Sequence, residues 1–277
     1  MPGVSWLRNG QCGGLIRPDD RGFAYGDGLF ETIAWRSGRP RFLDRHLLRL
    51  AQGCSRLGLP FPGNATLDRE IALLAAGHLH GTIRLTLTRG PGPRGYAPAD
   101  DSEPTRVVFF HPDPVRQPSP PGLSLALCQT PASNNTALAG MKTLNRLDNV
   151  LARVELAGTS FDEGVMCDGS GHVIGATAAN VFAVRAGVLL TPDLSQGGVA
   201  GIMRNLVLEC AGTHGIAVRE LRMTIDDLLG AEELFLTNAL TGLRAVTMFD
   251  GRRLPGGELT RAIVAALRDR GVQEDCA

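Results

Sequence analysis

Lysine is almost absent from this sequence of 277 residues. Lysine and arginine together number 28, but Lys142 is the only lysine and all the others are arginines. Arginine replaces lysine wherever only positive charge is needed, yet its guanidinium stays protonated and offers no amine. A partly buried lysine amine, by contrast, can lose its proton and attack a carbonyl carbon. Lys142 is therefore a candidate for covalent amine chemistry, and a leftover lysine without such a role is the alternative.

Several features that often reveal a function are missing. The six cysteines are scattered without a close pair, which fits neither a metal or redox motif nor a disulfide framework. The six histidines also lack the spacing of metal ligands, so no metal is expected. Because the formal net charge is zero, no global field favours nucleic acid or an anionic membrane. No apolar run approaches the ~18 residues needed to cross a bilayer, and we expect a cytoplasmic protein.

A proline-rich stretch divides the sequence. Residues 111–122 contain five prolines in twelve positions, which is typical of a semi-rigid connector. Patterns typical of strands and of helices occur on both sides of it. We therefore predict an α/β (α+β) fold with an N-terminal domain at 1–112, a linker at 113–121 and a larger C-terminal domain at 122–277.

Two stretches of the N-terminal half stand out by composition. Residues 20–32 contain three glycines within seven residues, which suits a close backbone approach to a ligand or to another chain segment. A plain turn before a strand would look the same. Residues 89–96 place Arg94 and Tyr96 on a loop stiffened by glycine and proline. A guanidinium fork and a hydroxyl suit a carboxylate, and ordinary solvated side chains are the alternative.

The segment around Lys142 is followed by a predicted helix. Leu144, Leu147, Leu151 and Val154 recur at the spacing of one helical face. This pattern predicts that Lys142 precedes the helix by a residue or two. The positive end of the helix dipole would then favour loss of the amine proton.

Two segments of the C-terminal half are suited to a phosphate. Residues 197–204 place a glycine-rich turn before an apolar helix, and the first N–H groups of a helix are suited to an anion. Residues 233–242 have the pattern of a strand that ends in a loop of small residues. Each signal is weak by itself because neither spacing is that of a nucleotide-binding motif. Together with the lone lysine they favour a phosphorylated aldehyde cofactor, and pyridoxal phosphate (PLP) has both groups.

The sequence as a whole resembles the fold-type IV PLP enzymes. This family includes branched-chain and D-amino-acid aminotransferases and 4-amino-4-deoxychorismate lyases. The resemblance covers nearly the full length and implies a two-domain fold with the cofactor in the cleft between the domains. It rests on residues 20–22, 25–32, 46–50, 142–147, 179–182, 198–204 and 237–240, in this order and spacing.

The resemblance also implies roles for individual residues. Lys142 resembles the lysine that binds the cofactor aldehyde covalently and then moves the substrate proton. Arg49 resembles the arginine that binds the phosphate, with backbone amides of the C-terminal domain completing the cradle. The implied cofactor-binding residues are Lys142, Arg49, Ile202, Met203, Asn238 and Ala239. The implied substrate-binding residues are Arg94, Tyr96, Thr32 and Tyr25, of which the first two hold the substrate carboxylate.

One position departs from the family pattern. Most members carry a glutamate five residues before the matching asparagine, where it pairs with the pyridine nitrogen of the cofactor. Counting back from Asn180, this sequence has Gly175. A ring without this carboxylate is a weaker electron sink for a carbanion. Transamination should therefore suffer more than an elimination that is driven by formation of an aromatic ring.

Within the family, residues 89–96 and 142–146 resemble the lyases more than the aminotransferases. The expected activity is that of a 4-amino-4-deoxychorismate lyase, which eliminates pyruvate to give 4-aminobenzoate for folate biosynthesis. Two alternatives stay open. One is a D-amino-acid or branched-chain aminotransferase, and the other is a catalytically impaired PLP-binding relative, because Gly175 replaces the usual glutamate. The resemblance further implies a small-molecule substrate and a homodimer with active sites near the subunit interface.

Overall fold

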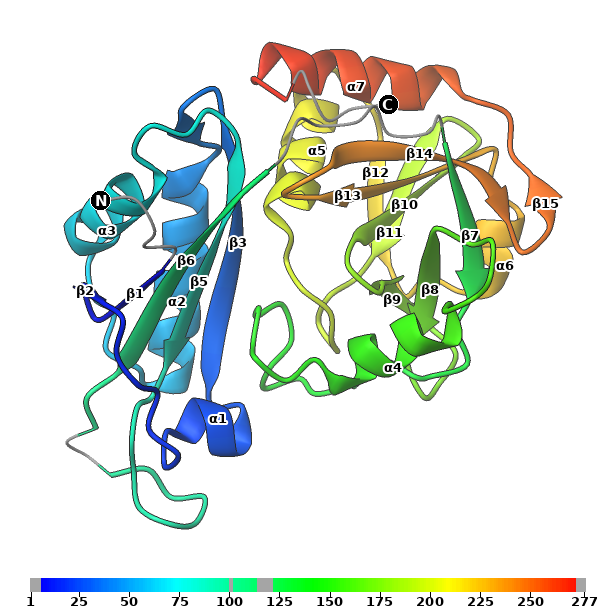
Figure 1. The fold of residues 1–277 in the computed structure, drawn as a ribbon. Coiled ribbons are helices and arrows are strands. Elements are labelled where there is room, and N and C mark those ends of the chain that lie inside the picture. The colour runs from blue at the N-terminus through cyan, green and yellow to red at the C-terminus, as the bar shows by residue number, and fades with distance from the viewer. Residues whose placement is uncertain (1–5, 100–101, 114–121, 273–277) are drawn as a thin grey trace. The chain divides into compact units, whose positions relative to one another are not determined.

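The chain folds into two compact units in this computed structural model. Unit 1 comprises Met1–Gln117 together with Met141–Asn145, and unit 2 comprises Pro118–Gly140 together with Arg146–Ala277. Both units combine helices with a sheet, which confirms the predicted α/β class (Figure 1). The structure describes residues 6–99, 102–113 and 122–272, so nearly all of the predicted linker at 113–121 lies outside the described residues.

Unit 1 is an antiparallel sheet with two helices on one face. Its elements are β1 (Trp6–Arg8), β2 (Gln11–Cys12), α1 (Arg21–Tyr25), β3 (Gly28–Arg36), β4 (Arg39–Pro40), α2 (Leu43–Leu57), α3 (Asn64–Ala75), β5 (Gly81–Thr88) and β6 (Thr105–Pro112). The strand order is β2-β1-β6-β5-β3-β4. In β5, Ile83, Leu85 and Leu87 are buried, whereas the side chains between them are half-buried. The buried face packs against α2 and α3, and the other face carries the polar positions.

The segment Met141–Asn145 lies along the edge of β3, although it is distant in sequence. The N–H of Phe30 donates to the carbonyl of Lys142 over 3.0 Å, and the N–H of Leu144 donates to the carbonyl of Gly28 over 3.0 Å. A bridge between Leu29 and Thr143 completes the antiparallel pairing. Lys142 is therefore fixed in register with β3.

Two glycines make room for this segment. Gly26 has φ +68°, and a Cβ there would lie 2.7 Å from the Oδ1 of Asn145. A Cβ on Gly28 would lie 2.5 Å from the carbonyl oxygen of Leu87 and 3.0 Å from a methyl group of Leu144. The sequence left open whether the glycines at 20–32 meet a ligand, a chain segment or only a turn. The structure shows the close approach of another chain segment.

Unit 2 is built on a mixed sheet of nine strands. Its elements are β7 (Leu123–Leu127), α4 (Leu147–Glu155), β8 (Glu163–Cys167), β9 (Val173–Ala176), β10 (Asn180–Arg185), β11 (Val188–Pro192), α5 (Ile202–Thr213), β12 (Val218–Leu221), α6 (Ile225–Leu229), β13 (Glu233–Asn238), β14 (Gly242–Phe249), β15 (Arg252–Arg253) and α7 (Glu258–Asp269). The strand order is β12-β11-β10-β13-β14-β7-β8-β9, with β15 paired to β14. The pairs β11–β12, β14–β7 and β7–β8 are parallel, and the others are antiparallel.

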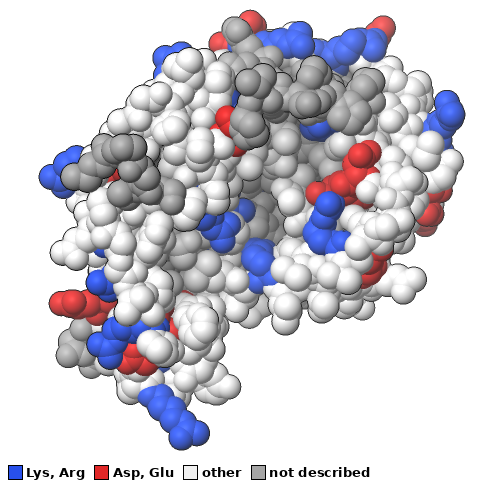
Figure 2. Space-filling model, in the orientation of Figure 1, with Lys and Arg blue, Asp and Glu red and all other residues white. Residues whose placement is uncertain are grey.

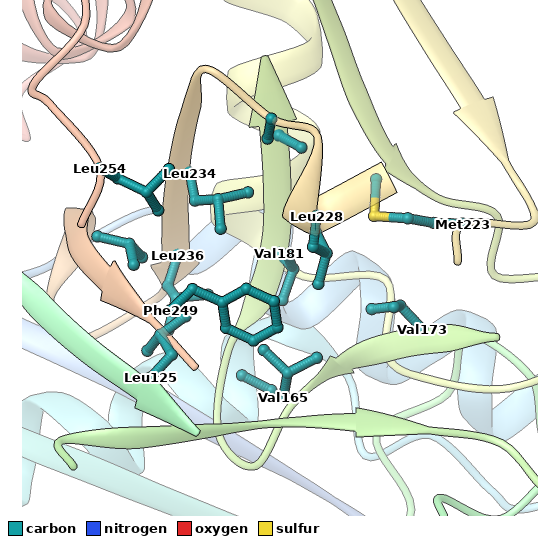
Figure 3. Close-up of a cluster of buried hydrophobic side chains, with 14 of the residues drawn as sticks. Leu125, Val165, Val173, Val181, Met223, Leu228, Leu234, Leu236, Phe249 and Leu254 are labelled. Carbon is teal, nitrogen blue, oxygen red and sulfur yellow. The ribbon is translucent and has the colours of Figure 1, made fainter. Parts of the chain in front are cut away.

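The sheet of unit 2 curls around a hydrophobic core. Leu125, Val165 and Val173 come from β7, β8 and β9 at one end of the strand order, yet they pack with Val181 of β10 and Phe249 of β14 (Figure 3). On the other side, α5 and α7 pack against β13 and against each other. The curl brings β9 next to β10, and so places the turn after β9 beside the start of α5.

The prediction that Lys142 lies one or two residues before a helix is wrong. Helix α4 begins at Leu147, and the intervening residues pair with β3 instead. The predicted apolar face exists, but Leu147, Leu151 and Val154 are 70%, 50% and 64% exposed, so it does not face the core. Because the influence of a helix dipole fades beyond the first turn, the dipole of α4 does not account for reactivity at Lys142.

Basic and acidic side chains are interspersed on the visible face, as the zero net charge leads one to expect (Figure 2). Within the described residues, every helix is too short or too polar to cross a bilayer. No group of three or more potential metal ligands occurs in that part of the chain either.

Candidate active site

The amine of Lys142 lies over an aromatic ring of unit 1. Its Nζ is 4.2 Å from the centroid of the Phe30 ring, which is 7% exposed. The backbone pairing with β3 explains this contact, because it places the two residues side by side. The lysine itself is half-buried, as an amine that reacts with a bound molecule must be.

A buried carboxylate next to Phe30 organises the other side of β3. Glu31 is 1% exposed, and its two oxygens accept from the Nε of Arg49 at 2.8 Å and from its Nη2 at 2.5 Å. The Nδ1 of His46 lies 2.7 Å from the same carboxylate. Both partners come from α2, where a spacing of three residues places them on one face of the helix. The fork fixes the plane of the Arg49 guanidinium.

The protonation states in this cluster follow from burial and charge. Burial alone would raise the pKa of the Glu31 carboxyl, but the hydrogen bond from His46 and the charge of Arg49 lower that pKa to about 2. Burial lowers the pKa of the His46 imidazole, and the charges of Arg49 and Lys142 act in the same direction, against the opposing effect of Glu31. At neutral pH, Glu31 is therefore ionised and His46 is neutral, with its Nδ1–H donating to the carboxylate.

The loop with the predicted anion-binding pair is held against α1. Arg21 is 3% exposed, and its guanidinium donates to the carbonyls of Gly95 and Tyr96 at 2.8 and 2.7 Å. The Tyr25 hydroxyl accepts from the N–H of Gly95, and the rings of Tyr25 and Tyr96 lie 5.6 Å apart. Arg94 is exposed, and Tyr96 is 87% exposed. The structure thus places Tyr25, at the end of α1, beside Tyr96, and Arg94 is exposed on the same loop as Tyr96.

Thr32 lies elsewhere in unit 1, on the half-buried face of the sheet. Its register partner on β5 is Arg84. The guanidinium carbon of Arg84 is 3.5 Å from the centroid of the Phe30 ring, so Thr32, Arg84, Phe30 and Lys142 form one group. A cation, a hydroxyl and an amine are therefore close to one aromatic ring.

The first turn of α5 presents backbone N–H groups in unit 2. The N-cap of α5 is Gly201, which supplies no side-chain cap, and the N–H groups of Ile202 and Met203 belong to the first turn. A Cβ on Gly201 would lie 2.0 Å from the Oδ1 of Asn180, so only glycine fits there. Asn180 in turn donates to the carbonyl of Val199 at 2.9 Å and ties the turn to β10. This helix start suits an anion.

The loop after β13 is ordered by its own asparagine. The Asn238 side-chain oxygen accepts from the N–H groups of Leu240 and Thr241 at 3.0 and 2.8 Å, and from the Thr241 hydroxyl at 2.9 Å. Asn238 thus shapes the loop that carries Ala239. Because Asn180 and Thr237 are register partners on β10 and β13, this loop and the start of α5 flank the same pair of strands.

Gly175 lies in β9 opposite Met166. Its φ is outside the left-handed region, and the only atom within 4 Å of a Cβ built there is the Ala179 carbonyl oxygen, at 3.1 Å. A Cβ there would therefore require the Ala179 carbonyl to move by a few tenths of an ångström. The carboxylate of Glu163, on the adjacent strand β8, accepts from the N–H of Gly164 and lies against the Thr177 hydroxyl.

Sequence reasoning assigned no role to four residues of unit 1 that take part in these contacts. Glu31 and His46 lay within the segments that carry the resemblance, but no role was derived for them. Phe30 also lies within one of these segments, whereas Arg84 had no signal beyond its place in an alternating strand. An acidic residue at an inward position of a strand was the available clue to Glu31, because buried carboxylates need partners.

The sequence model of the family "Amino-transferase class IV" matches residues 28–249. The chain belongs to this family, which confirms the family expected from the motifs.

Similar proteins within the family include two lyases and one aminotransferase. The aminodeoxychorismate lyase of Vibrio harveyi is 35% identical over 251 residues, which cover 88% of this chain and 92% of the relative. The crystal structure of the 4-amino-4-deoxychorismate lyase from Pseudomonas aeruginosa has a TM-score of 0.90 and 39% identity, and the match covers 96% of this chain and 99% of that chain. A putative branched-chain-amino-acid aminotransferase of Methanocaldococcus jannaschii is 31% identical over 258 residues, covering 90% of this chain and 89% of the relative.

Replacing Glu31 by glutamine should weaken both the fold and the retention of PLP. The change removes the buried charge that Arg49 faces, which is expected to cost about 3 kcal/mol of stability. The Arg49 guanidinium is then no longer held in one plane by a carboxylate, so the Kd for PLP, measured by fluorescence titration, should rise at least tenfold. Folding lowers the pKa of Glu31 from 4.5 to about 2. Its contribution is therefore complete above pH 4.5 and lost as the pH falls towards 2, and Glu31→Gln should flatten this acid dependence of the thermal midpoint.

Glu70→Gln is the matched control for this prediction. Glu70 receives two bonds from Arg106 at 2.7 and 2.6 Å, and the pair is buried to a similar degree in the same unit. This variant should lose stability and keep the wild-type Kd for PLP. Equal Kd values for Glu31→Gln and the wild type would contradict the expected role of Arg49 in binding the phosphate of PLP.

Proposed function

We propose that this protein is a PLP-dependent lyase that converts 4-amino-4-deoxychorismate into 4-aminobenzoate and pyruvate. The observation that carries the proposal is the match, over nearly the whole of both chains, to proteins of that activity. The chain supplies the necessary amine through Lys142, the only lysine of the sequence. We further propose that the enzyme is a cytoplasmic homodimer, as the family resemblance implies.

The residues present fit the chemical groups of PLP. Its aldehyde requires an amine, and Lys142 is the only side-chain amine. Its phosphate requires cations and N–H donors, and each unit contains such groups: Arg49 in unit 1, and in unit 2 the first-turn amides of Ile202 and Met203 and the loop of Ala239 that Asn238 shapes. When bound, PLP withdraws electrons from the carbon that bears the substrate amine, and so makes the proton on that carbon acidic.

Side chains of unit 1 are assigned to proton transfer and to substrate binding. When it is not bonded to the cofactor, the Lys142 amine would accept the proton from the carbon that bears the substrate amine. The bond between the enolpyruvyl oxygen and the adjacent ring carbon would then break as the ring becomes aromatic, and the departing enolate would take a proton on its methylene carbon, equivalent to the one that Lys142 removed, to become pyruvate. We assign Thr32, Tyr25, Arg94 and Tyr96 to substrate binding, because their hydroxyls and guanidinium suit a substrate with two carboxylates.

Release of pyruvate from 4-amino-4-deoxychorismate is the direct test of this function. The purified protein with PLP should release pyruvate, detected with lactate dehydrogenase, without any keto-acid acceptor. An aminotransferase would instead require an amino acid together with 2-oxoglutarate and would show ping-pong kinetics. Turnover of D-alanine or a branched-chain amino acid without pyruvate release from aminodeoxychorismate would overturn the proposal. PLP binding with neither activity would identify an impaired relative.

Gly175→Glu tests whether elimination tolerates the missing carboxylate. An added Cβ meets only the Ala179 carbonyl oxygen, at 3.1 Å, so the comparison uses variant protein whose native fold is verified by circular dichroism. The added charge should raise the pKa of the pyridine nitrogen and increase any side transamination tenfold or more. The lyase rate should change by less than tenfold, because formation of the aromatic ring drives the elimination. Gly175→Gln adds the same bulk without charge and is the control. A lyase gain of a hundredfold in Gly175→Glu alone would show that the glycine impairs the native enzyme.

A further inference from the structure

One aromatic ring of unit 1 meets two cations. The Nζ of Lys142 lies 4.2 Å from the Phe30 centroid, and the guanidinium carbon of Arg84 lies 3.5 Å from it. The ring is 7% exposed, so little water competes for its faces. Since the face of an aromatic ring carries negative electrostatic potential, each contact attracts the cation. Phe30 is thus more than a space-filling residue beside the lysine.

The ring itself is held firmly. Phe30 lies at one end of the hydrogen-bonded pairing between β3 and Met141–Asn145, and its own N–H donates to the Lys142 carbonyl. On the other side of β3, its register partner on β5 is Thr86, and Arg84 reaches the ring from two residues away. Guanidinium groups stack well on aromatic rings because they are planar and weakly hydrated. Arg84 therefore braces the ring from a neighbouring strand.

A lysine whose amine is released from a covalent bond during the reaction needs a contact that keeps the amine near its point of release. When the substrate amine takes over the cofactor aldehyde, the Lys142 amine is released at the end of a chain of four carbons. That chain gains rotamer freedom, which competes with the geometry needed for proton transfer. A contact over the ring keeps the amine near its point of release. The contact is strongest when the amine carries a proton, which is the state it enters after proton abstraction.

We propose that Phe30 is a positioning residue that holds the Lys142 amine over its ring whenever that amine is not bonded to the cofactor, and that Arg84 braces the ring. The inference rests on the proposed role of Lys142. This role of Phe30 differs from the roles that the sequence motifs imply, because Phe30 acts through the face of its ring and not through a polar group. It predicts a contact in the cofactor-free chain and a kinetic effect in the loaded enzyme.

The single lysine makes the contact directly observable. Reductive methylation of the cofactor-free full-length chain with ¹³C-formaldehyde labels only Lys142 and the α-amino group. In the wild type, the Lys142 methyl resonance should be shifted upfield by the ring current of Phe30. Phe30→Leu should remove the shift. Phe109→Leu should preserve it, because Phe109 stacks on His111 instead, at 4.1 Å. The same upfield position in the wild type and Phe30→Leu would overturn the proposal.

Kinetics of the loaded enzyme separate positioning from packing. Phe30→Leu should lower kcat roughly tenfold with less than a twofold change in KM, and Phe109→Leu should leave both near wild type. Pentafluorophenylalanine at position 30 keeps the ring shape but reverses the sign of the potential on its face. It should reproduce the fall in kcat in a protein whose thermal midpoint is close to wild type. Wild-type kcat for the fluorinated protein would overturn the proposal.

Failure of the proposed function has a different signature. If the wild type releases no pyruvate, the lyase assignment fails, but the methyl resonances still report whether Phe30 holds the amine. If the wild type is active and the resonances do not depend on Phe30, only the positioning role fails. The two outcomes are therefore distinguishable.

Discussion

The backbone pairing of Met141–Asn145 with β3 is the constraint on which the proposed chemistry depends. Two hydrogen bonds of 3.0 Å fix the register, and that register decides which side chain of β3 meets Lys142. A slip by one residue would turn the lysine to the opposite face. The glycines at 26 and 28 are part of the same constraint, since a Cβ at either position would collide with its neighbours. The loop segment Met141–Asn145 is thereby positioned by hydrogen bonds of the kind that join two strands.

A second constraint is the buried charge of Glu31. Isolation of a carboxylate from water is unfavourable, so its bonds to Arg49 and His46 stabilise the fold and also orient a cation. The same side chain thus links the stability of unit 1 to the orientation of the residue assigned to the phosphate. Phe30 and Glu31 point to opposite sides of β3. The contact with the Lys142 amine therefore lies on one face of the sheet, and the carboxylate that orients Arg49 lies on the other.

From the sequence, the cofactor and the reaction could be predicted better than the local backbone geometry. The lone Lys142 and the glycine-rich start of α5 were readable because amine chemistry and anion binding need particular residue types. The α/β class followed from periodicity. The position of Lys142 was predicted incorrectly, because the apolar spacing of Leu147, Leu151 and Val154 indicates a helical face but not where the helix begins. Its pairing with β3 joins residues more than a hundred positions apart. The stack of Arg84 on Phe30 depends on strand register and had no sequence signal.

Covalent trapping of the cofactor tests the central claim that Lys142 is the reacting amine. The protein loaded with PLP is reduced with borohydride, digested and analysed by mass spectrometry. The phosphopyridoxyl group should be found on the peptide that contains residue 142, and Lys142→Arg, which keeps the charge, should carry none on its side chains. Because the sequence has no other lysine, only the α-amino group competes. Label found only at the N-terminus, or retained equally in Lys142→Arg, would contradict the account.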